Sequence, residues 1–157
     1  MNADARTSPA DRPAGRRLGG GSVTASARGV TATFAATAEA PTLARQAASP
    51  ALVGWPAEWR DAALLVISEL VTNAVVHGSA GPADCVALVL RPRAGATRIE
   101  VSDQRRGRGG AAVWTAAANG RAAGSGWGLA LVATLSDRWG VEREPTRTRV
   151  WCELDGA

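Results

Sequence analysis

The stretch Leu64–Gly78 constrains the fold more than any other, because it combines a long helical pattern with polar residues at regular spacing. It reads LLVISELVTNAVVHG. Glu69, Asn73 and His77 are four residues apart, so in an α-helix they lie along one narrow stripe. The rest of the circumference is predicted to be apolar and is formed by Leu65, Val66, Leu70, Ala74 and Val75.

This polar stripe has two interpretations. A carboxylate, an amide and an imidazole set into an apolar surface are costly unless a partner satisfies them, which indicates a bound ligand. The other interpretation is that the stripe faces water on an amphipathic helix, which is the commoner case for a single helix. Two motifs further along the chain favour the ligand.

Composition excludes several kinds of function. The chain has 157 residues, enough for one domain of ordinary size. Its 18 basic residues are all arginine, so a phosphate-binding loop of the Walker A type, which needs a lysine, is excluded. Five arginines and two aspartates place +3 of the formal charge of +4 in the first 30 residues. The remainder is near neutral, and we expect no direct contact with nucleic acid there.

The first 29 residues are rich in Arg, Gly and Ala and contain almost no large apolar side chain. Such a segment cannot bury enough surface to offset the entropy lost on ordering, so we predict that residues 1–29 form a disordered tail. A solvated extension and a basic docking arm both fit this composition. Residues 30–157 are predicted to form the folded domain.

Cysteine usage and hydropathy favour a cytoplasmic protein. Cys85 and Cys152 lie far apart in apolar runs without metal-ligand or redox spacing, so they are interpreted as buried thiols, with a disulfide between adjacent strands as the alternative. No apolar run approaches the ~18 residues of a membrane span, and the amino terminus lacks a hydrophobic secretory core. We therefore expect no membrane segment.

The hydrophobic pattern after residue 29 predicts alternating strands and helices. Strands are expected at Val30–Thr37, Asp84–Leu90, Thr97–Ser102, Asp137–Arg143 and Thr148–Leu154. Helices are expected at Leu43–Val53, opened by Pro41 and Thr42 and interrupted by Pro50, and at Ala57–His77 and Gly126–Leu135. The segment 104–125 is rich in Gly and Arg and is predicted to be a lid with a short helix at Ala111–Ala118. This order predicts an α+β two-layer sandwich with helices on one face of a mostly antiparallel sheet.

Two further motifs follow the central helix. Asp103 ends a predicted strand, where a carboxylate can accept a hydrogen bond from an exocyclic amine, although aspartate also ends strands for turn chemistry alone. The second motif is GSGWGL, which covers 124–129 and opens a helix. Its glycines let backbone amides approach an anion, and the helix dipole favours negative charge there.

Together and in this order, the motifs ELVTNAVVH, VSD and GSGWGLALV resemble the GHKL ATP-binding (Bergerat) fold of DNA gyrase, the ninety-kilodalton heat-shock chaperone and histidine kinases. The later stretches GWGLALVATLSDRWGVE and VWCEL make the chain most similar to the small anti-sigma-factor serine/threonine kinases and related bacterial regulators. The resemblance extends from about Phe34 to Leu154.

The resemblance implies roles for individual residues. Asn73 would bind Mg²⁺ and, through it, the triphosphate, and Glu69 would be the general base. His77 would lie near the nucleotide, or only shape its pocket, and Asp103 would bind the adenine amino group. The remaining residues implied at the nucleotide are Gly107, Gly124, Gly126, Trp127, Gly128, Leu129 and Thr148. Trp127 would either cover the nucleotide or pack inward.

The chain departs from the family pattern after the second strand. Many relatives carry Asp-x-Gly-x-Gly, whereas this chain reads Asp103-Gln104-Arg105-Arg106-Gly107, so the first glycine is replaced by arginine. The arginines of the lid would either reach a phosphate or face solvent.

The resemblance implies an ATP- and Mg²⁺-dependent serine/threonine kinase that regulates transcription through a sigma factor and an anti-anti-sigma antagonist. A homodimer is compatible with this function. The altered segment after Asp103 favours the alternative of a non-catalytic module that holds a sigma factor beside a degenerate ATP site, whereas Glu69 and Asn73 favour the kinase. Binding of DNA by the basic tail is a third hypothesis.

Overall fold

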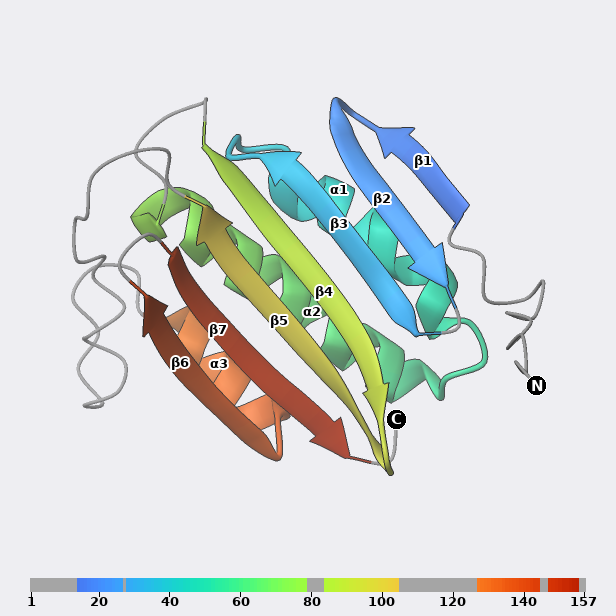
Figure 1. The fold of residues 1–157 in the computed structure, drawn as a ribbon. Helices are drawn as coiled ribbons and strands as arrows, with labels where there is room; N and C mark the ends of the chain where they lie inside the picture. The colour runs from blue at the N-terminus through green and yellow to red at the C-terminus, as the bar shows by residue number, and fades with distance from the viewer. Residues whose placement is uncertain (1–13, 27, 79–83, 105–126, 145–146, 156–157) are drawn as a thin grey trace, which may run out of the picture.

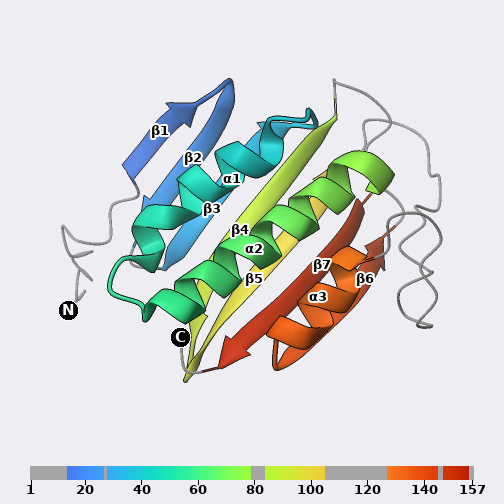
Figure 2. The same cartoon turned by 180° about the vertical axis from the view of Figure 1, so that it is seen from behind.

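The computed structural model describes residues 14–26, 28–78, 84–104, 127–144 and 147–155. These residues form a seven-stranded sheet in the order β1-β2-β3-β4-β5-β7-β6, in which all pairings are antiparallel. The helices lie on one face of the sheet, as Figures 1 and 2 show from opposite sides. The predicted α+β sandwich with a mostly antiparallel sheet is therefore confirmed.

The strands are β1 (Ala14–Leu18), β2 (Gly21–Ser26), β3 (Gly29–Ala35), β4 (Cys85–Arg93), β5 (Ala96–Gln104), β6 (Arg138–Glu144) and β7 (Arg147–Asp155). The helices are α1 (Ala40–Ala48), the 3₁₀-helix η2 (Ser49–Leu52), α2 (Ala57–Asn73), the π-helix η3 (Ala74–Gly78) and α3 (Trp127–Leu135). No helix in the described ranges combines the length and apolar character that a bilayer crossing requires.

The core lies between the sheet and the helices. Alternate residues of each central strand point toward the helix layer, and in β5 these include Ile99 and Val101, which are almost completely buried. Helix α2 buries Val66, Ile67 and Leu70 against them. Helix α1 contributes mainly alanines to the core, and these small side chains let it approach the sheet closely.

The prediction of a disordered tail is wrong for Ala14–Ser26, which form the hairpin β1–β2 at the edge of the sheet. Composition missed it because an edge hairpin needs few apolar side chains when a neighbouring strand satisfies its backbone. Val23 faces the core with 3% of its surface exposed, and Leu18 packs against the core from β1. Gly19 and Gly20 adopt positive φ angles of 51° and 80° and form the tight turn. Residues 1–13 lie outside the described part of the chain.

Two helical predictions also needed adjustment. The first helix begins at Ala40, one residue before the Pro41 that was expected to open it. The expected interruption at Pro50 is confirmed, since the α-helix ends at Ala48 and Pro50 lies within the 3₁₀-helix η2, because proline cannot donate the helical hydrogen bond. The central helix begins at Ala57 as expected, but it is α-helical only to Asn73. The expected helix at Ala111–Ala118 lies outside the described residues.

The outer face of β5, β7 and β6 carries a network of charged side chains. Arg98 donates hydrogen bonds to Glu100 (2.7 Å) and Glu153 (3.2 Å), and its guanidinium lies 3.9 Å from the centroid of the Trp151 ring. Arg138 and Arg149 form further ion pairs, with Glu153 and Glu142 respectively. Desolvation lowers the pKa of Arg98, but the hydrogen bonds to the two glutamates outweigh it and raise the pKa.

The two cysteines are both free thiols. Cys85 is half-buried on β4, whereas Cys152 is buried on β7 and faces the core. Strand β5 separates these two strands, which excludes the alternative of a disulfide between adjacent strands. Burial raises the pKa of the Cys152 thiol to about 12.

Candidate functional site

Four element ends that carry predicted site residues meet at one end of the sandwich. Strand β5 ends beside the start of β7, since Gln104 pairs with Arg147. The carboxyl-terminal end of α2 and the start of α3 lie at this same end of the molecule (Figures 1 and 2). Segments that are far apart in the sequence therefore bring their polar residues to one region.

Glu69 and Asn73 meet the first turn of α3. A Cβ atom placed on Gly128 would lie 2.8 Å from Glu69 Oε2 and 2.8 Å from Asn73 Nδ2. These distances are shorter than any ordinary contact of a Cβ atom, so only glycine leaves both side chains in place. The sequence prediction that these three residues share a site is consistent with this contact.

The stripe on α2 is less uniform than predicted. Glu69 and Asn73 are half-buried, on the side of the helix that faces α3. Val66 and Leu70 are buried as expected, but 43% of Leu65 is exposed, so the helix is not apolar around the whole of its remaining surface. In the described residues Glu69 forms no ion pair, and it is among the residues that line a cavity.

That cavity, of about 270 Å³, is lined by Glu69 together with Ala130, Leu131 and Thr134 of α3. The three α3 residues were missed in the sequence, because an alanine, a leucine and a threonine in an apolar helix read as core. Leu131 and Thr134 are three residues apart, and Ala130 and Thr134 are four apart, so the three residues lie on neighbouring parts of one helical face. This spacing was the available signal in the sequence.

Asp103 lies near the end of β5 and is 99% buried, with 1% of its surface exposed. Its Oδ1 atom accepts a hydrogen bond of 2.6 Å from the backbone N–H of Thr148, the residue opposite it on β7. A buried carboxylate needs such donors, because desolvation without them is costly. The pairing of β5 with β7 thus brings together two predicted site residues, Asp103 and Thr148, that are 45 positions apart.

His77 lies in the single π-helical turn η3, which packs against β5. The backbone N–H of Ala74, where the α-helix gives way to the π-turn, faces the carbonyls of both Leu70 and Val71. Single π-turns inside helices occur often at functional sites. A sequence pattern based on the α-helix could not show this turn.

Several predicted site residues cannot be placed. Gly107, Gly124 and Gly126 lie outside the described residues, as does the predicted lid, except that Gln104 is the last residue of β5. Trp127 opens α3, and its side chain is not described. Leu129 packs into the hydrophobic core with 8% of its surface exposed.

The arrangement suits an anion next to a hard metal ion. The start of α3 presents backbone N–H groups that have no partner within the helix, and its dipole favours negative charge. The amide of Asn73 and the carboxylate of Glu69 supply oxygen ligands and a base beside this helix end. Gly128 leaves the space that a side chain would fill.

Comparison with known proteins supports the fold. The family model of the histidine kinase-like ATPase domain matches residues 33–153, which is most of the chain. The chain belongs to the histidine kinase-like ATPase family. The matched range of this histidine kinase-like ATPase domain contains Glu69, Asn73, Asp103, Gly128 and Thr148.

Among solved structures, this histidine kinase-like ATPase domain is similar to the RsbU and RsbW domains of Rv1364c from Mycobacterium tuberculosis, with a TM-score of 0.54 and 23% sequence identity. The similarity covers 80% of the present chain and 32% of that protein's chain, and it concerns the fold. No curated protein of known function matches this domain.

Proposed function

We propose that the chain binds ATP with Mg²⁺ and transfers the γ-phosphoryl group to a serine or threonine of a partner protein. The observation that carries this proposal is the contact of Glu69 and Asn73 with Gly128 at the start of α3. A carboxylate, an amide and a helix amino terminus supply a base, a metal ligand and an anion site within one region. Membership in the histidine kinase-like ATPase family supports the choice of ATP.

The proposal gives each of these residues a role. Asn73 would bind Mg²⁺ through its amide oxygen, which does not repel the phosphates. Mg²⁺, when bound, neutralises phosphate charge. Asp103, buried at the end of β5, would accept a hydrogen bond from the adenine amino group, and Thr148 would lie beside it.

The reaction needs a base and a positioned hydroxyl. Glu69 would take the proton of the acceptor hydroxyl while the hydroxyl oxygen forms a bond to the γ-phosphorus. The bond from that phosphorus to the β–γ bridging oxygen breaks, which releases ADP. The cavity of about 270 Å³ beside Glu69 provides space for the side chain that carries the hydroxyl.

The proposed partners are a sigma factor and an anti-anti-sigma antagonist that serves as the phosphate acceptor. Similarity to a structure that includes an RsbW domain supports this choice. A homodimer and a cytoplasmic location are parts of the same proposal.

Isothermal titration with ATP and Mg²⁺ tests nucleotide binding. We expect saturable binding that falls at least about tenfold in Asn73→Ala, because one metal ligand is lost. In Asp103→Asn the hydrogen bond from Thr148 is retained, but preference for ATP over GTP decreases. Binding of neither nucleotide, or equal binding by all three proteins, would refute the proposal.

A second experiment separates the kinase from a non-catalytic module with a degenerate ATP site. A partner isolated by affinity capture is incubated with γ-labelled ATP and either the wild type or Glu69→Gln. The kinase predicts that Glu69→Gln binds ATP and partner normally but transfers at least about 100-fold less label, since the base is gone. If the wild type and Glu69→Gln both bind the partner and neither transfers label to it, the chain is a non-catalytic module.

A further inference from the structure

The face of the sheet opposite to the helices carries a recess of about 390 Å³ near the turn between β2 and β3. Figure 1 views the sheet from this face, and no helix in the described ranges covers it. Arg91 lines the recess and lies five residues along β4 from Val86, the partner of Asp103. Five strand residues correspond to about 17 Å. The recess is therefore separate from the proposed nucleotide site.

Three hydroxyl groups line one side of the recess. Thr24 lies directly opposite Thr31 in the antiparallel pair β2–β3, and both residues are exposed. Ser26 follows two residues after Thr24, so it points to the same face, and it lies opposite Gly29, which has no side chain to fill the space. Its Oγ atom accepts a hydrogen bond of 3.1 Å from the backbone N–H of Arg28. The O–H of Ser26 can still donate to a ligand.

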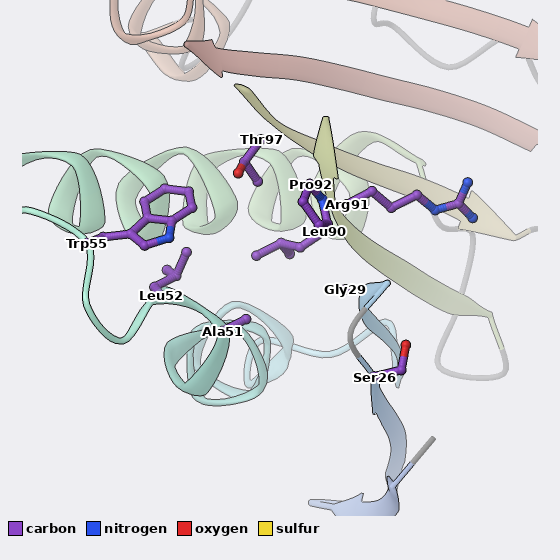
Figure 3. A pocket seen from close by; sticks show the side chains of 9 residues that line it. All are labelled: Ser26, Gly29, Ala51, Leu52, Trp55, Leu90, Arg91, Pro92 and Thr97. Carbon is purple, nitrogen blue, oxygen red and sulfur yellow. The ribbon is translucent and has the colours of Figure 1, made fainter. Parts of the chain in front are cut away.

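Two arginines, Arg28 and Arg91, also line the recess, and no carboxylate is among the described lining residues. On β4, Leu90 is buried in the core, so the next residue, Arg91, points to the opposite face of the sheet. Figure 3 shows Leu90 directed toward Trp55 and Arg91 extending away from it. The recess is therefore basic, and its arginines belong to the face without helices.

Arg91 lies in an unfavourable charge environment. It is directly opposite Arg98 on β5, and like charges at opposite positions of an antiparallel pair destabilise that pair. Arg98 is compensated by Glu100 and Glu153, whereas Arg91 forms no ion pair within the described ranges. An anion bound beside Arg91 would supply the missing negative charge.

A terminal phosphate group suits this lining better than a carboxylate does. It carries close to two negative charges near neutral pH and has three oxygens that accept strong hydrogen bonds. These oxygens can accept hydrogen bonds from guanidinium and hydroxyl groups on several sides, whereas a carboxylate offers two oxygens in one plane. A phosphate diester keeps one charge and only two such oxygens.

We propose that the recess between Arg28 and Arg91 binds a terminal phosphate group, as free phosphate or as a phosphate monoester. The guanidinium of Arg91 would bind two phosphate oxygens, and the hydroxyl groups of Thr24, Ser26 and Thr31 would donate hydrogen bonds to the phosphate. The proposal does not depend on whether the chain binds ATP.

Nuclear magnetic resonance of the ¹⁵N-labelled full chain at constant ionic strength tests the proposal with inorganic phosphate, methyl phosphate and dimethyl phosphate. We expect phosphate to shift the backbone amides of Ser26, Thr31 and Arg91 with a dissociation constant on the order of 1 mM. Dimethyl phosphate should bind at least about fivefold more weakly, because it has lost one charge and one oxygen.

Methyl phosphate distinguishes the two sources of the phosphate group. Affinity within about twofold of that of inorganic phosphate would show that the site takes a phosphate monoester. Binding at least about fivefold weaker than that of inorganic phosphate would assign the site to free phosphate.

Two pairs of variants locate the site. Arg91→Gln should weaken phosphate binding at least about fivefold, whereas Arg93→Gln, two residues further along β4 and outside the lining, should change it less than about twofold. Thr31→Val should weaken binding about threefold because a hydrogen-bond donor is lost, and Thr33→Val, on the same strand but outside the lining, should not.

Four results would overturn the proposal. These are the absence of saturable shifts at Ser26, Thr31 and Arg91, equal affinity for phosphate and dimethyl phosphate, equal losses in Arg91→Gln and Arg93→Gln, and shifts confined to the end of the molecule that contains Asn73.

Discussion

At the scale of single residues, Gly128 decides whether Glu69 and Asn73 can share the start of α3. In Gly128→Ala, the new methyl group would occupy the space now left for Glu69 Oε2 and Asn73 Nδ2, each 2.8 Å from its position. These two atoms are the far ends of flexible side chains and can move aside, so the fold should remain. The free energy of unfolding should change by no more than about 1 kcal/mol. ATP affinity should fall at least about tenfold, because both polar groups are displaced. Calorimetry and urea unfolding measure the two effects.

The same substitution at Gly140 is the control. There the Cβ atom would meet the ring of Trp151 at 2.8 to 3.0 Å, far from the proposed nucleotide site. Gly140→Ala should lower the free energy of unfolding by about 1 to 3 kcal/mol through overpacking, while nucleotide affinity is unchanged. A loss of stability without a loss of affinity in Gly128→Ala would contradict the assigned role of this glycine.

The two thiols provide another prediction at this scale. Burial raises the pKa of Cys152 to about 12, so at pH 8 its thiol is protonated and shielded from reagents. Cys85 is half-buried on β4 and should react first. We expect Ellman's reagent to modify one thiol per native chain at pH 8 and two after unfolding, with Cys85→Ser abolishing the native reaction. Fast native modification in Cys85→Ser would contradict the burial of Cys152.

At the scale of elements, Arg98 joins β5 to β7 and β6 across the outer face of the sheet. Its side chain is 14% exposed, pairs with Glu100 and Glu153, and stacks on Trp151. Arg98→Ala should lower the free energy of unfolding by about 2 kcal/mol, because two glutamates lose a partly buried partner and the indole loses its stacked cation. Urea denaturation measures this value.

Arg138→Ala is the comparison for this prediction, because Arg138 also pairs with Glu153 but its side chain is 55% exposed. Water screens an exposed pair, so its loss should matter much less. Equal destabilisation by the two variants would mean that the stacked, partly buried geometry of Arg98 contributes nothing specific.

At the scale of the whole molecule, the β1–β2 hairpin extends the sheet and covers the edge of β3. Val23 is the most deeply buried side chain of the hairpin, and the partly buried Leu18 also packs against the core. We expect Val23→Ala to reduce the free energy of unfolding by about 1 to 3 kcal/mol, and Ser22→Ala, on the exposed face, to change it by less than about 0.5 kcal/mol. Equal effects in thermal or urea unfolding would show that the hairpin is not part of the cooperative fold.

The sequence was sufficient for the type and order of the strands and helices described after Gly29, because most of their apolar residues recur with the period of the element that buries them. It was insufficient for the hairpin at Ala14–Ser26, whose stability comes mainly from backbone pairing with β3 rather than from apolar side chains. The turn through Gly19 and Gly20, between two short alternating runs, was the available signal.

The same limit applies to the site. Spacing alone grouped Glu69 with Asn73, but only the packing of α3 on α2 shows that Gly128 lies against both. The hydrogen bond from Thr148 to Asp103 depends on the register between β5 and β7 and could not be read from either strand alone. The π-turn that carries His77 is not predicted by residue propensities.

The most direct test of the proposed nucleotide site is titration of the ¹⁵N-labelled chain with ATP and Mg²⁺, followed residue by residue by nuclear magnetic resonance. We predict saturable shifts that concentrate at Asn73, Gly128 and Thr148 and that are lost in Asn73→Ala. Absence of saturable shifts, or shifts that gather at Ser26 and Thr97 at the other end of the molecule, would contradict the account.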